Sequence, residues 1–104
     1  MILSEQEFRL EADRALESLQ RSLLPMADAD GFEVELQNGV LQVIFEEPAP
    51  AKFVISPNAP VRQVWLSARS RSYKLAWSQE QSTFTLGGET LEQLVARLAT
   101  EQLG

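Results

Sequence analysis

Carboxylate side chains dominate the chemistry open to this sequence, because its 104 residues include no cysteine and no histidine. Glu33 and Glu35 lie two residues apart in an alternating segment, so both should share one face of a strand, about 7 Å apart. Glu17 lies toward the end of a predicted first helix, and Asp28 and Asp30 lie between that helix and the strand. If helix and strand are neighbours, these acids form a semi-continuous ridge. Carboxylate ligands select hard cations such as Ca²⁺, Mg²⁺, Mn²⁺ or iron.

A ridge of this kind would hold a cation only weakly. Exposed carboxylates keep their hydration, and the sequence has neither EF-hand spacing nor a candidate for a buried cage. The ridge therefore suits temporary holding of a metal, or electrostatic docking on a basic surface, better than a fixed cofactor. A plainer interpretation stays open here, in which the exposed acids only keep the domain soluble.

The missing residue types exclude most other chemistry. Without cysteine, the chain forms no disulfide, thiolate zinc site, cysteine nucleophile or iron–sulfur cluster of its own. Without histidine, serine and threonine lack the usual base that activates them as nucleophiles. The sequence has no P-loop, dinucleotide-binding or zinc signature. We therefore expect no enzyme activity, no catalytic residues and no tightly held cofactor.

The net charge of −6 is divided unevenly along the chain. Residues 1–50 contain eleven acids against three arginines, whereas residues 51–104 contain four acids against six basic residues. The acidic first half disfavours a nucleic-acid backbone as partner and favours cations or a basic protein surface. The N-terminus lacks signal-peptide features, and no apolar run has the length of a membrane span. We expect a cytoplasmic monomer that binds neither nucleic acid nor membrane.

A first helix is predicted from a capping box made by Ser4 and Glu7. Apolar residues then recur at helical spacing and form one buried stripe. The stripe consists of Phe8, Ala12, Ala15, Leu16, Leu19 and Leu23. Pro25 is expected to end this helix, and residues 27–31 are expected to form a polar connector.

Period-two alternation after the connector predicts five or six strands. They are expected over residues 32–37, 40–46, 51–56, 61–68, 73–77 and 84–86. Asn38-Gly39 should form a type I′ hairpin turn. Further turns are expected at residues 57–60 and 70–72, and Gly87-Gly88 should end the run of strands.

A closing helix is predicted from a second capping box, made by Thr90 and Gln93, to about Gln102. Consecutive strands joined by short turns imply an antiparallel sheet, and each helix has one apolar face to bury. The fold class is therefore α+β. We expect a two-layer sandwich in which two helices pack on one face of a five- to six-stranded antiparallel sheet, as one domain over residues 1–104.

Trp65 is predicted to face solvent together with Gln63, because its neighbours in the strand should face the core. A large aromatic side chain on the exposed face of a sheet is a typical contact for a partner protein. The alternative is that Trp65 lies flat on the sheet for packing, beside Ile44 or Val54.

Several strings in the sequence resemble the frataxin family, in its bacterial CyaY-type branch. The most specific is Gln63-Val64-Trp65-Leu66-Ser67, which follows a proline-containing turn. The supporting strings are Asn38-Gly39-Val40-Leu41, Ser72-Tyr73-Lys74-Leu75-Ala76-Trp77 and Gly88-Glu89-Thr90-Leu91-Glu92-Gln93-Leu94. The resemblance covers almost the whole chain in one register.

The resemblance implies an α-β-α sandwich that binds ferrous and ferric iron weakly on an acidic ridge. It also implies contact with the cysteine desulfurase and scaffold proteins that build iron–sulfur clusters, as an iron-responsive regulator or an iron donor. The implied metal-binding residues are Asp13, Glu17, Asp28, Asp30, Glu33 and Glu35. The implied partner-binding residues are Trp65, Gln63, Glu33 and Glu35.

The sequence departs from the family pattern at the end of the first helix, which is usually strongly acidic. Here Arg14 and Arg21 dilute the negative charge, and residues 20–25 contain no acid. We therefore expect weaker iron binding than a fully acidic ridge would give. The alternative function is an electrostatic adaptor between proteins, in which iron binding is incidental. Ferroxidase activity or iron storage is less favoured, because no histidine or tyrosine lies in the ridge.

Overall fold

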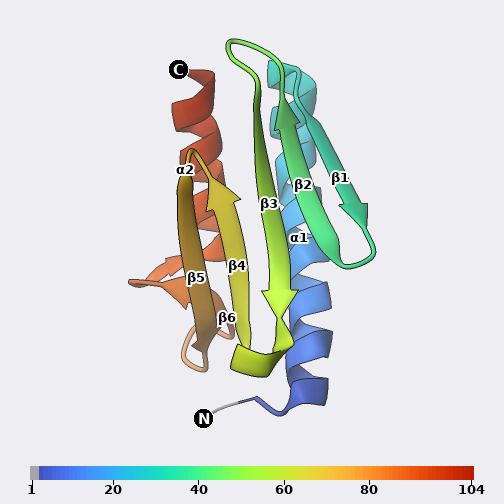
Figure 1. Cartoon of the computed structure of the whole chain (residues 1–104), viewed down its shortest axis with the longest axis vertical. Coiled ribbons are helices and arrows are strands. Elements are labelled where there is room, and N and C mark those ends of the chain that lie inside the picture. Colours follow the sequence, from blue (N-terminus) through green and yellow to red (C-terminus); the bar gives the residue numbers. More distant parts are fainter. Residues whose placement is uncertain (1–2) are drawn as a thin grey trace.

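The computed structural model describes residues 3–104 and has two helices packed on one face of an antiparallel sheet (Figure 1). This arrangement confirms the predicted α+β sandwich. The helices are α1 (Glu5–Asp30) and α2 (Leu91–Leu103), and a 3-10 turn covers Ala59–Val61. The strands are β1 (Glu33–Gln37), β2 (Val40–Phe45), β3 (Ala51–Asn58), β4 (Gln63–Ala68), β5 (Arg71–Ser78), β6 (Thr83–Leu86) and β7 (Glu89–Thr90).

The sheet is a simple meander, in which each strand pairs antiparallel with the next one along the chain. Short hairpin turns produce this order, because they return the chain directly beside the strand it has just left. The predicted turn at Asn38-Gly39 is confirmed, since both residues have positive φ values of 53° and 75°. It pairs Gln37 with Val40 and so fixes the register of β1 on β2.

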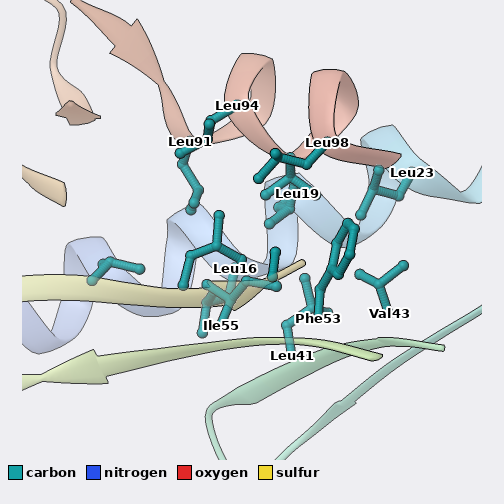
Figure 2. Close-up of a cluster of buried hydrophobic side chains, with 14 of the residues drawn as sticks. Leu16, Leu19, Leu23, Leu41, Val43, Phe53, Ile55, Leu91, Leu94 and Leu98 are labelled. Carbon is teal, nitrogen blue, oxygen red and sulfur yellow. The ribbon is translucent and has the colours of Figure 1, made fainter. Parts of the chain in front are cut away.

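The core lies between the helices and the inner face of the sheet (Figure 2). Alternate residues of each central strand point into it, as the period-two pattern predicts; Leu41, Val43 and Phe45 of β2 are all buried. Figure 2 shows Leu16, Leu19 and Leu23 of α1 and Leu91, Leu94 and Leu98 of α2 above Leu41, Val43, Phe53 and Ile55 of the sheet.

The predicted end of the first helix is wrong, and Glu17 therefore lies in the middle of α1 and not toward its end. Pro25 lies inside α1, and the helix continues to Asp30, so residues 27–30 are helical and do not form a connector. Proline lacks an N–H and crowds the carbonyl four residues earlier. Pro25 is exposed, whereas Ala27 beyond it is buried with the same stripe as Leu23. Burial of that stripe therefore outweighs the local penalty of proline.

Strand boundaries also differ from prediction. Val61 lies in the 3-10 turn, and β4 begins at Gln63 and not at residue 61. Pro57 and Asn58 belong to β3 and not to a turn, because they pair with Val64 and Gln63 of β4. The hairpin between β4 and β5 turns at Arg69 and Ser70, both with positive φ, and not at residues 70–72. This turn lacks the asparagine or glycine that usually marks a type I′ turn.

Over the residues that the structure describes, the sheet has seven strands, against the predicted five to six. Gly87 and Gly88, with φ values of 58° and 84°, reverse the chain and do not end the run of strands. They lead into the two-residue strand β7, which pairs with β6. The predicted capping box then starts α2 directly after β7: Thr90 and Gln93 exchange hydrogen bonds of 3.0 and 3.2 Å.

Polar contacts attach α2 to its surroundings. The Arg97 guanidinium donates to both carboxylate oxygens of Glu89, at 3.0 and 3.1 Å, and to Glu101 at 3.1 Å. The hydrogen bond from Arg97 holds the pKa of Glu89 below its ordinary value. Ser18 of α1 donates a short hydrogen bond to Glu92, which joins the two helices.

Candidate docking and metal-binding surface

The corner between α1 and β1 brings four of the predicted site acids close together in the chain. Asp28 and Asp30 lie in the last turn of the helix, and Glu33 and Glu35 lie in the strand that follows. Only Gly31 and Phe32 separate the two elements. Gly31 adopts the left-handed conformation (φ 78°), and its N–H donates to the Ala27 carbonyl at 2.8 Å. This cap reverses the chain at once, as a C-terminal glycine does in many helices.

The six predicted metal-binding residues are all exposed, and we call this set the acidic ridge. It consists of Asp13, Glu17, Asp28, Asp30, Glu33 and Glu35. None of the six takes part in an ion pair within residues 3–104. On the sheet, Glu33 and Glu35 lie opposite Ile44 and Gln42 of β2, which carry no charge. The ridge therefore keeps its negative charge available to an external cation or a basic surface.

The acids at the end of α1 act against the stability of the helix. A helix carries partial negative charge at its C-terminus, where carboxylates are unfavourable by about 0.3–1 kcal/mol each. Asp28 and Asp30 lie at this end, and the last turn contains no basic residue to offset them. The fold thus tolerates a local electrostatic cost at the same corner where the sequence predicts a binding surface.

The ridge does not form a compact metal cage. Within residues 3–104, no group of three or more acidic side chains is close enough together to hold one metal ion. Asp13 lies apart from the corner and lines a groove of about 420 Å³ between the first half of α1 and the hairpin turn at Asn38. A cation on this surface would therefore be held by one or two carboxylates and by water, an arrangement that gives loose stoichiometry.

Trp65 points to the outer face of the sheet, as predicted, and 37% of its surface is exposed. Its indole Nε1 donates to Gln63 Oε1 at 2.9 Å, which fixes the ring along the strand. Lys74 Nζ lies 4.9 Å from the ring centroid, within the range of a cation–π contact. The direct cross-strand neighbours of Trp65 are Ser56 and Lys74, and not Ile44 or Val54 as the packing alternative supposed.

The contact between Lys74 and the Trp65 ring was not predicted from the sequence. A hairpin centred on Arg71 would place Trp65 opposite Trp77, whereas the observed two-residue turn at Arg69 and Ser70 places it opposite Lys74. The length of the segment between the two strands is compatible with a two-residue turn. The turn has no glycine or asparagine to mark its position, however. Trp77 instead stacks edge-on against Phe84, with ring centroids 5.3 Å apart.

Neither helix, over the residues that the structure describes, is long and apolar enough to span a bilayer.

The fold and the surface define a class of protein: a small two-layer α+β sandwich with an acidic helix-to-strand corner and an exposed tryptophan on its sheet. A family model described as "Frataxin-like domain" matches residues 1–104. The chain therefore belongs to the frataxin-like family, and its relatives place it in the CyaY-type branch.

Two similar proteins are each named "Iron-sulfur cluster assembly protein CyaY". The one from Pseudomonas syringae pv. tomato is 31% identical over 93 residues, which cover 86% of this chain and 83% of that protein. The one from Pseudomonas putida is 32% identical over 111 residues, which cover 99% and 96%. A solved frataxin from Psychromonas ingrahamii shares the fold, with a TM-score of 0.76 at 19% identity over 96% of this chain and 91% of that one.

Proposed function

We propose that this chain is a non-catalytic accessory protein of iron–sulfur cluster assembly, which docks on the cysteine desulfurase through the acidic ridge and binds iron weakly there. The general role in cluster assembly is supported by family membership and by the names of the CyaY relatives. One observation supports docking above all: six exposed acids have no cationic partner within the part of the chain that the structure describes. Such unpaired charge steers and orients a basic partner surface.

Iron enters this proposal as a cargo or a signal. Hard cations prefer carboxylate oxygens, and the ridge offers those ligands alone. Because one or two carboxylates would share each ion, binding is expected to be weak and reversible. Weak binding suits either an iron donor or a regulator whose docking changes when iron is present.

The alternative proposal is an electrostatic adaptor, for which iron binding is incidental. The absence of a three-carboxylate group within residues 3–104 favours it over a dedicated iron site. Both proposals share the docking surface, so a measurement with and without iron separates them.

The test is the affinity for cysteine desulfurase at low and high salt, each with and without Fe²⁺ under anaerobic conditions. We expect affinity to fall by at least about tenfold between 50 and 300 mM salt, because exposed charges are screened over about 10 Å at 0.1 M. Affinity that does not change with salt would contradict docking through the ridge. Affinity that falls with salt but is the same with and without iron would favour the adaptor over the iron-responsive regulator.

Trp65 is proposed as a second contact for the assembly machinery. Replacing Trp65 by Ala should weaken partner binding by about tenfold, because an aromatic side chain at the centre of a contact supplies much of its energy. The free energy of unfolding should change by less than about 1 kcal/mol, since the ring is part-exposed on the outer face. Calorimetric binding and urea unfolding of the same sample test both parts. A large loss of stability would instead show that Trp65 serves packing.

A further inference from the structure

Strand β1 is the outermost strand on its side of the sheet. It pairs with β2 along one edge, and within residues 3–104 no strand pairs with its other edge. In Figure 1, β1 lies at the margin of the molecule beside the end of α1. An unpaired edge strand presents a row of backbone N–H and C=O groups that can template another strand.

The hairpin register identifies which backbone groups face outward. In a two-residue type I′ hairpin the residues that flank the turn form a hydrogen-bonded pair, and bonded and non-bonded pairs then alternate along the ladder. Gln37 and Val40 flank the turn, so Gln37, Glu35 and Glu33 direct their backbone groups to β2. Val34 and Leu36 therefore direct theirs away from the sheet. No hydrogen bond of the described residues uses the N–H or C=O of Val34 or Leu36 outside the ladder.

The side chains of β1 select the partner that could use this edge. Glu33 and Glu35 are exposed on one face of the strand, while Val34 and Leu36 on the other face are only half buried. A second copy of this chain would bring its own glutamates beside these on the same face, where like charges repel. A segment that alternates basic and apolar residues would instead place cations beside the glutamates and cover Val34 and Leu36.

We propose that the outer edge of β1 accepts an extended segment of alternating basic and apolar residues as an eighth strand of the sheet. Backbone hydrogen bonds to Val34 and Leu36 would supply affinity, and Glu33 and Glu35 would supply the selection for charge. This inference rests on the proposed function, because it specifies how a basic partner engages the ridge. It adds that the recognised element is a strand, and not merely a positively charged surface.

The first test needs no substitution. The probe is a nine-residue peptide that alternates lysine and valine, compared with a peptide of the same composition whose lysines are in one block. At saturation with the alternating peptide, the exchange of the Val34 and Leu36 amide hydrogens should slow by about tenfold, because bonded amides are protected. The amides of Glu33, Glu35 and Gln37, already bonded to β2, should change little. Equal effects of the two peptides, or no slowing at Val34 and Leu36, would overturn the proposal.

The second test compares Val34→Pro with its matched control Val34→Ala. Both variants lose the valine side chain, but only proline also loses the outward N–H, and it removes no bond to β2. Val34→Pro should bind the alternating peptide about three- to tenfold more weakly than Val34→Ala, as expected for one backbone hydrogen bond. Equal affinities would overturn the strand contact.

The same two variants, measured against cysteine desulfurase, separate this inference from the proposed function. Equal and salt-sensitive binding by both would leave docking through the ridge intact while contradicting the strand contact. If the unaltered protein does not bind cysteine desulfurase at all, the proposed function itself is contradicted.

Discussion

Replacing Glu33 and Glu35 together by lysine is expected to weaken binding to cysteine desulfurase by about a hundredfold at low ionic strength. Each substitution turns an attractive contact into a repulsive one, and juxtaposed like charges cost several kcal/mol at an interface. The two residues are exposed and make no ion pair within residues 3–104, so their replacement breaks no ion pair. The double variant should therefore unfold within about 0.5 kcal/mol of the unaltered protein.

The matched control is Glu46→Lys with Glu47→Lys. These two acids are also exposed and close together in the sequence, but they lie after β2 in the loop before β3. The net charge changes by the same amount in both double variants. A difference in their affinity for cysteine desulfurase therefore reports the position of the charges and not the total charge. Equal loss of binding in the two variants would show that only the net charge of the domain matters, and would contradict a defined ridge.

Replacing Pro25 by alanine is expected to raise the free energy of unfolding by about 2 kcal/mol. Proline inside a helix is about 3 kcal/mol less favourable than alanine. Alanine also gives the unfolded chain more conformational freedom, which offsets about 0.4–1 kcal/mol of this stabilisation. Pro25 is exposed within α1, so alanine creates no cavity in the core. The new N–H can bond to the carbonyl of Arg21 and so restore the helical ladder at this point.

Urea unfolding of Pro25→Ala and Pro60→Ala measures this effect with a control. Pro60 is also exposed, but it lies in the first turn of a short 3-10 helix, where proline is tolerated. Pro60→Ala should change stability by less than about 1 kcal/mol. A gain no larger for Pro25 than for Pro60 would show that α1 has adapted its packing to the proline. If Pro25→Ala is more stable but docks less well, the proline serves the placement of Asp28 and Asp30.

Local signals in the sequence predict much of this fold. The capping boxes at Ser4 and Thr90 start both helices at the residues expected, because a cap depends only on the next three residues. The positive φ angles at Asn38 and Gly39 follow from their residue types in the same way. The turn at Arg69 and Ser70 has no such residue types, and its position follows from the pairing of two whole strands.

For the candidate site, too, some features follow from local sequence and others only from the tertiary structure. The sequence by itself determined that Glu33, Glu35 and Trp65 face outward, because alternation along a strand is a local property of the backbone. It also determined that the chain has no cysteine or histidine side chain for chemistry, which follows from composition alone.

Only the tertiary structure decided that Asp28 and Asp30 belong to the helix, that Lys74 lies over Trp65, and that one edge of β1 pairs with no other strand among residues 3–104. Each of these depends on residues far apart in the chain. Burial of the α1 stripe carries the helix past its proline, and the register between strands sets which side chains and backbone groups meet. Packing and register are properties of the assembled sheet and helices, and no short window of sequence contains them.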